Sequence, residues 1–101
     1  MGQILYNVTV KVTKDISQDW LQWMKEVHIP DVLATGLFLE HKICKILHEE
    51  EDGDTYAIQY YCKNMEDFQT YQENHAKALQ KDHSDRYQNK YMAFRTLMEV
   101  V

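Results

Sequence analysis

The stretch "LFLEHKICKILHEEEDGDTYAIQYYC", residues 37–62, decides the fold because its pattern predicts two strands joined by a hairpin turn at "EEEDGD", residues 49–54. Its second half, residues 55–62, alternates between two sets of side chains, which is typical of a strand with one buried face. In its first half, apolar residues occupy both odd-numbered and even-numbered positions, which indicates either a bulge or burial on both faces. The dipeptide Asp52-Gly53 between the halves is a hairpin signal.

A strand and a helix precede this hairpin. Residues 4–13, "ILYNVTVKVT", alternate with period two and are rich in β-branched residues, so they predict a strand. Apolar residues recur at helical intervals over residues 17–28 and predict a helix. Pro30 lacks a backbone N–H, so we expect the helix to break there and His28 to lie at its C-terminus. Residues 30–35 then form a short second helix that ends at Gly36.

A helix and a strand follow the hairpin. Asn64 is a good N-cap for a helix over residues 65–81. The apolar stripe of this helix contains Phe68, Tyr71, His75, Leu79 and, one turn further, His83. Residues 91–101 predict a last strand.

The resulting order, βαββαβ, predicts an α+β fold. Two right-handed βαβ halves give a ferredoxin-like sandwich, a single domain over residues 1–101. Its four-stranded antiparallel sheet has the strand order 4-1-3-2, and both main helices cover one face. The open face is too apolar to contact water, since we place on it Leu5, Leu39, Leu47, Ala57, Tyr61 and Leu97. We therefore expect a homodimer whose open sheet faces pack together.

Composition excludes several classes of partner. The net charge is −5 and no run of Lys or Arg occurs, which argues against nucleic-acid and anionic-membrane binding. No apolar segment is long enough to span a bilayer, and the N-terminus does not resemble a signal peptide. We expect a cytoplasmic protein in which Cys44 and Cys62 are reduced, buried thiols, roughly opposite each other on paired strands.

Three segments resemble a known family: "ILYNVTV", "W-x-x-W-M-K-E-V-H-I-P-D-V-L-x-T-G" and "AFRTL-x-E-V". They resemble a family of small bacterial proteins of unknown function within the dimeric α/β-barrel superfamily. The resemblance implies a ferredoxin-like dimer, and it implies no particular activity. The superfamily includes small monooxygenases, haem-degrading enzymes and proteins that are not enzymes.

The haem-degrading members offer a comparison residue by residue. Their pattern has an Asn on the first strand, which Asn7 matches. It also has a Trp on the long second helix, where this chain has Phe68 or Tyr71. The haem-ligating His has no clear counterpart, since neither His75 nor His83 has the expected spacing. We therefore predict no cofactor and keep haem as an alternative.

Few residues stand out as candidates for chemistry. The catalytic candidates are His28, His75 and Asn7, and each His also has a structural interpretation, as a helix-closing or a partly buried residue. The candidates for binding a flat ligand are Trp20, Tyr60, Tyr71 and His75. No metal site is predicted, because no HxH, HxxxH or CxxC spacing occurs.

These observations lead to one functional hypothesis and two alternatives. The first is a homodimer of unknown function that binds a small molecule between the helices and the sheet. One alternative is a small monooxygenase or haem-degrading type of enzyme that uses the same cleft. The other is a non-catalytic interaction or regulatory module.

Overall fold

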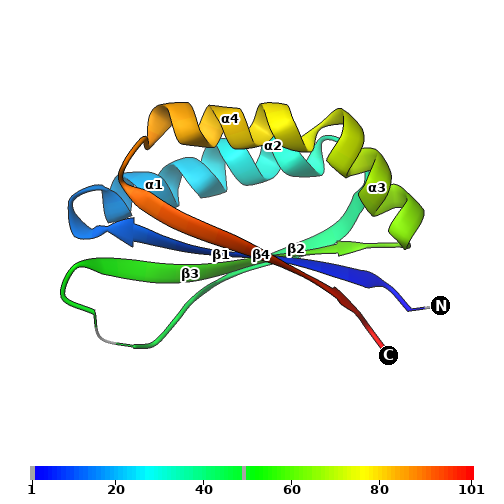
Figure 1. Ribbon diagram of the computed structural model, residues 1–101, viewed down its shortest axis with the longest axis horizontal. Coiled ribbons are helices and arrows are strands. Elements are labelled where there is room, and N and C mark those ends of the chain that lie inside the picture. Colours follow the sequence, from blue (N-terminus) through cyan, green and yellow to red (C-terminus); the bar gives the residue numbers. More distant parts are fainter. Residues whose placement is uncertain (1, 49) are drawn as a thin grey trace.

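The computed structural model describes residues 2–48 and 50–101, and its helices lie together on one side of a four-stranded sheet (Figure 1). The strands are β1 (Ile4–Thr13), β2 (Phe38–Lys45), β3 (Gly53–Cys62) and β4 (Tyr91–Glu99). The helices are α1 (Ser17–Trp23), α2 (Ile29–Leu33), α3 (Met65–Asn74) and α4 (Ala76–Arg86). A 3-10 turn (Lys14–Ile16) precedes α1, and a π-helical turn (Met24–His28) joins α1 to α2. None of the described helices is both long and apolar enough to cross a membrane.

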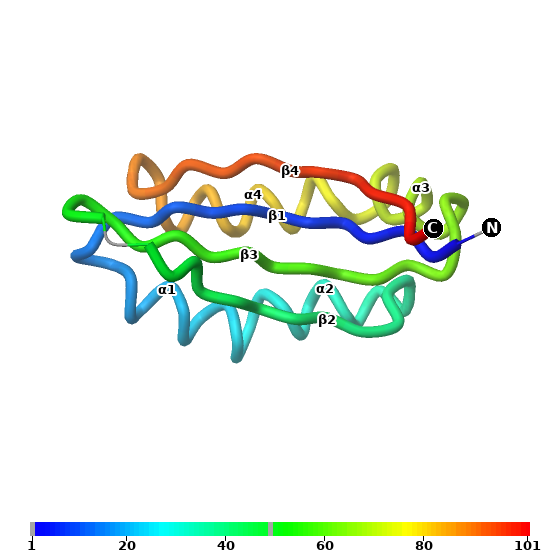
Figure 2. Tube along the Cα trace, turned by 90° about the horizontal axis from the view of Figure 1, so that it is seen from below, coloured from blue at the N-terminus to red at the C-terminus, as the bar shows by residue number. Residues whose placement is uncertain are grey.

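The sheet confirms the predicted ferredoxin-like topology. Its order is β2-β3-β1-β4, and the three neighbouring pairs are antiparallel. Seen from below, the four strands lie side by side in front of the helices, so one face of the sheet is bare (Figure 2).

The core lies between the helices and the covered face of the sheet. Alternate residues of the central strands point into it, among them Val12 and Ile58, which are completely buried. From the helices, Trp20 and Val32 are buried to the same extent. Trp23, three residues after Trp20, is only half-buried, as the helical repeat requires.

The predicted break at Pro30 is wrong, because the chain remains helical from Ser17 to Leu33. Both His28 and Ile29 have α-helical dihedral angles. The Ile29 N–H donates to the carbonyl of Met24, five residues earlier, so this turn is wider than an α-helical turn. Such widening relieves the clash that a proline ring causes inside a helix. His28 therefore does not close a helix. Gly36, with φ of +79°, ends α2 as predicted.

The second long helix is divided, which the sequence did not predict. Asn64 caps it as expected, since its side chain accepts a hydrogen bond of 2.8 Å from the Asp67 N–H. At His75 the backbone leaves the helical region, with φ of −130°, and α4 starts at Ala76 and extends to Arg86. His75 is thus a junction residue between α3 and α4.

Strand β2 has the bulge that its sequence pattern allowed. The register with β3 shifts between Phe38 and Glu40, so Leu39 is the extra residue, and the strand ends at Lys45. The shift places Cys44 opposite Ala57, and Cys62 opposite Phe38. The predictions that the two cysteines face each other and that both are buried are wrong, because only Cys62 is buried.

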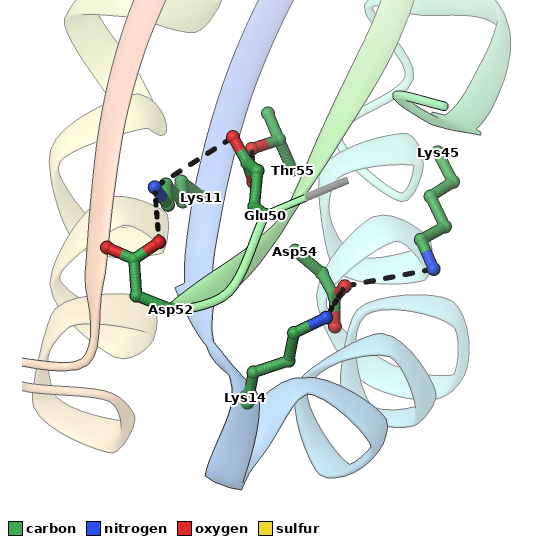
Figure 3. Close-up of polar contacts among 7 residues, drawn as sticks. All are labelled: Lys11, Lys14, Lys45, Glu50, Asp52, Asp54 and Thr55. Carbon is green, nitrogen blue, oxygen red and sulfur yellow. Dashed lines mark hydrogen bonds and ion pairs between the residues drawn. The ribbon is translucent and has the colours of Figure 1, made fainter. Parts of the chain in front are cut away.

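The acidic segment between β2 and β3 is held by lysines (Figure 3). Lys11 lies 3.0 Å from a carboxylate oxygen of Asp52, and Lys14 lies 2.8 Å from one of Asp54, which Lys45 also approaches. Gly53 begins β3, where a Cβ atom would meet the Val12 carbonyl oxygen at 2.5 Å. Asp52 and Asp54 are thus each paired with at least one lysine. Glu49, also part of the predicted turn, lies outside the described residues.

Candidate functional site

A cavity of about 40 Å³ lies between the helices and the middle of the sheet. Its apolar lining includes Val8 and Val10 of β1, Ile58 of β3 and Ala93 of β4. Its polar lining consists of Tyr6, His28, Tyr60, Tyr71, Gln80, His83, Tyr91 and Arg95. A single water molecule needs roughly 10–15 Å³ by this kind of measure. The cavity therefore accommodates a few waters or a head group of a few atoms.

His83, on α4, is the most constrained polar residue of the lining. The indole N–H of Trp20 donates a hydrogen bond of 2.8 Å to its Nε2 atom. Burial lowers the pKa of His83 to about 4, and repulsion from the protonated form of His28 and from the guanidinium of Arg95 acts in the same direction. His83 is therefore neutral near pH 7. Because Nε2 accepts from Trp20, the single ring proton is on Nδ1.

The Nδ1 atom of His83 differs from Nε2 in its surroundings. Among the described residues, no buried side-chain nitrogen or oxygen lacks a hydrogen-bond partner, and Nδ1 has no partner among them. This atom is therefore not fully enclosed, and the ring to which it belongs lines the cavity. The site thus contains a donor whose orientation Trp20 fixes.

The π-helical turn places His28 at the same cavity. Residues five apart diverge by about 140° on an α-helix. In the wider turn, by contrast, His28 stacks on Trp23 with ring centroids 5.1 Å apart. Its ring centroid lies 5.7 Å from that of His83. Burial lowers the pKa of His28, although the carboxylates of Asp31 and Asp82 oppose this shift.

Three buried tyrosines form another part of the lining. The ring of Tyr6 lies 6.1 Å from that of Tyr60 and 6.0 Å from that of Tyr71. Burial raises the pKa of each hydroxyl, so all three are neutral and can donate hydrogen bonds. Arg95 partly opposes the rise in the pKa of Tyr6.

Arg95, on β4, brings a positive charge to the cavity. It pairs with Val8 of β1 in the sheet register, on the helix-covered face. It is the exposed member of the lining, so the cavity is accessible beside it. Within the part of the chain that the structure describes, Arg95 forms no ion pair, whereas Arg86 lies 3.6 Å from a carboxylate oxygen of Asp19.

The structure brings some of the predicted candidates together and separates others. His28, Tyr60 and Tyr71 line the cavity, and Trp20 reaches it through His83. His75 lies outside the lining, where it stacks on Tyr71 with centroids 6.4 Å apart. Asn7 points to the open face of the sheet and donates a hydrogen bond of 3.0 Å to Thr9 Oγ1.

The sequence candidates did not include Arg95, Gln80 or Tyr6. The sequence does contain an indication for Arg95, because it alternates with Tyr91 and Ala93 on the side of β4 that faces the helices. A lone arginine among the strand positions that face the helices is unusual and indicates a site.

Leu97 also occupies one of these positions, so its predicted place on the open face is wrong.

The cavity residues do not fit haem. The cavity is far too small for a porphyrin, and His83 has its Nε2 atom occupied by Trp20. His75 lies outside the lining. No group of three His, Cys, Asp or Glu residues among those described is placed to hold a metal ion.

Comparisons with known proteins agree with this fold. A family model described as "Domain of unknown function (DUF4286)" matches residues 3–101. A Bacteroides thetaiotaomicron protein of unknown function, described as a possible oxidoreductase, is 16% identical, with a TM-score of 0.73 and 98% of both chains covered. A dimeric ferredoxin-like protein from an uncultured marine organism is 17% identical, with a TM-score of 0.71 over 97% of this chain and 93% of that one.

A third similar structure has a described activity. SnoaB of Streptomyces nogalater, a cofactor-independent oxygenase, is 10% identical, with a TM-score of 0.69 over 100% of this chain and 95% of that one. No curated protein matches the sequence. At these identities the structures show the fold alone. The family match confirms the resemblance to an uncharacterised family, and the similar structures confirm the ferredoxin-like fold.

Proposed function

Because the chain belongs to the family described as "Domain of unknown function (DUF4286)", we propose its function from its own geometry: a homodimer that binds a small molecule. The observation that carries this proposal is the cavity. Polar groups from α4, β3, β4 and the π-helical turn line it together with apolar side chains of the sheet. An apolar pocket with a few convergent polar groups is the usual form of a small-molecule site.

The homodimer part of the proposal rests on the open face. Several large apolar side chains on that face are exposed, namely Met92, Phe94 and Met98 of β4. Beside them, Leu5 and Tyr61 are only half-buried. A contiguous apolar surface of this kind is typical of an interface. A second copy supplies a matching apolar surface through a two-fold axis, and two similar structures are described as dimeric ferredoxin-like proteins.

A cavity-filling variant tests ligand binding. Ala93 lies on the cavity floor, so Ala93→Leu places three further carbon atoms in the space that a ligand would take. We expect small acids, amides or amines to shift the backbone amide NMR signals of cavity residues in the wild type. These shifts should be lost in Ala93→Leu.

The matched control is Ala78→Leu, the same change at an exposed position of α4. It should bind as the wild type does. Binding that persists in Ala93→Leu would place the ligand elsewhere. If a dimer forms and no small molecule binds, a non-catalytic interaction module is the function that remains.

A second candidate is an oxygenase that needs no bound cofactor, the activity described for SnoaB. The lowered pKa of His28 favours it, because a neutral imidazole beside the cavity can accept a proton from a bound acid. The test measures oxygen uptake with the molecules that bind. Loss of uptake in His28→Gln, with binding retained, would support this candidate, and no uptake with any of them would oppose it.

A further inference from the structure

We propose that the ligand is a small organic anion, and that Arg95 and His83 bind its carboxylate. This inference rests on the proposed function, since it names the class of molecule that the same cavity takes. It commits to the chemistry of the head group and to the two residues that recognise it.

The first argument is the charge of the lining. The chain has 16 acidic and 11 basic residues, yet none of the Asp or Glu residues that the structure describes lines the cavity. Asp31 and Asp82 are the acidic groups that act on His28, and both are exposed and outside the lining. Among the described residues that line the cavity, only Arg95 carries a full charge near pH 7, on its guanidinium. A site with this charge attracts anions and disfavours cations.

The second argument is that Arg95 is available. Arg86 is engaged by Asp19 and by the rings of Trp23 and Tyr87. Arg95, in contrast, has no ion-pair partner among the residues that the structure describes, and its side chain hydrogen-bonds the hydroxyl of Tyr6, which lines the same cavity. Its planar guanidinium presents parallel N–H donors, which match the two oxygens of a carboxylate.

The third argument is the fixed donor on His83. With Nε2 accepting from Trp20, the ring proton is on Nδ1, and the ring lines the cavity. This N–H can donate to an anionic oxygen and has no lone pair to accept from an amine. The positioning residue is Trp20, because its hydrogen bond selects the tautomer.

The fourth argument is size. A carboxylate has three non-hydrogen atoms, which suits a cavity of about 40 Å³. The apolar floor around Val8 and Ile58 suits a short carbon chain. A short aliphatic acid therefore matches both the polar and the apolar parts of the lining.

Three molecules of nearly equal shape test the inference: propanoate, propanamide and propylamine. NMR titration of the wild-type protein detects the weak binding expected of such small ligands. We expect propanoate to bind most tightly. Arg95→Gln, which keeps a donor and removes the charge, should weaken propanoate binding roughly tenfold or more. Lys77→Gln, the matched loss of charge at an exposed position of α4, should leave it unchanged.

A measurement on the unaltered protein covers the case in which a variant is misfolded. Histidine ¹⁵N chemical shifts report which ring nitrogen carries the proton. We expect His83 to be protonated on Nδ1, and this signal to shift when propanoate is added. A proton on Nε2, or an Nδ1 signal that propanoate leaves unchanged, would overturn the role of His83.

The outcomes separate the two proposals. Equal or tighter binding of propanamide or propylamine would retain a small-molecule site and overturn its selectivity for anions. Equal propanoate affinity in Arg95→Gln would overturn the role of Arg95. Failure of all three molecules to bind would contradict the ligand site itself.

Discussion

The two faces of the sheet depart in opposite ways from the usual arrangement, in which polar side chains are exposed and large apolar side chains are buried. On the helix-covered face, polar groups such as His83 and Tyr60 are buried beside a cavity. On the open face, Met92 and Phe94 are 76% and 64% exposed. Each set of side chains is unsuited to the surroundings that the isolated chain provides.

The difference teaches which partner each face lacks. Polar groups that line a small cavity can hydrogen-bond a molecule small enough to enter it, which is the property of a ligand. Exposed apolar side chains spread over the open face of a sheet match a broad apolar surface, and a second protein chain can provide one. On the two proposals above, one sheet has two sites, and a substitution on one face should leave the function of the other unchanged.

The largest expected effect is on the open face. Phe94→Glu would bury two unpaired carboxylates in each homodimer, one from each copy, at a cost of several kcal/mol. We expect the dimer dissociation constant to rise at least about 100-fold. Sedimentation equilibrium measures this change. Propanoate binding in the cavity should remain.

The control is Gln72→Glu, which adds the same charge at an exposed position of α3. It should form dimers as the wild type does. A wild-type protein that sediments as a monomer, or a Phe94→Glu variant that still dimerises fully, would assign another role to the open face.

The next effect is a pH dependence of stability from the covered face. The pKa of His83 falls from 6.5 to about 4 on folding, because burial disfavours its charged form. A lowered folded pKa gives a contribution that is complete above pH 6.5 and is lost as the pH falls toward 4. It amounts to about 3 kcal/mol. Urea unfolding at fixed protein concentration across this range measures it.

His83→Gln provides the comparison, since glutamine retains an acceptor for Trp20 and does not titrate. The free energy of unfolding of this variant should vary less between pH 6.5 and 4. Some dependence remains, because burial also lowers the pKa of His28. Equal slopes in the two proteins would show that His83 is not held neutral by burial.

Much of the fold could be predicted from local patterns. Alternation placed β1 at residues 4–13, and Asn64 and Gly36 marked helix ends through their own side-chain and backbone chemistry. The uninterrupted helix through Pro30 could not be predicted in this way. It depends on a π-helical turn, and a proline alone more often indicates a break.

The site was less predictable, because it depends on which distant residues meet. His28 was a candidate for its position in the chain, and it reaches the cavity because the helix continues past it. His83 gains its role from Trp20, which is 63 residues away in the sequence. Arg95 was readable from strand parity once the neighbouring residues of β4 were assigned to the covered face.

A substitution of Asn7 has the smallest expected effect, and it best tests whether the two faces of the sheet act independently. Its position on β1 matches a residue of the haem-degrading pattern, yet its side chain lies on the open face, bonded to Thr9. Asn7→Ala removes one neutral hydrogen bond, worth about 1 kcal/mol. We expect the dimer dissociation constant to change by less than about tenfold, and propanoate affinity to stay within about twofold. NMR titration and sedimentation on the same samples measure both. A tenfold loss of propanoate affinity would show that the two faces are coupled through β1, because Val8, the next residue, lines the cavity.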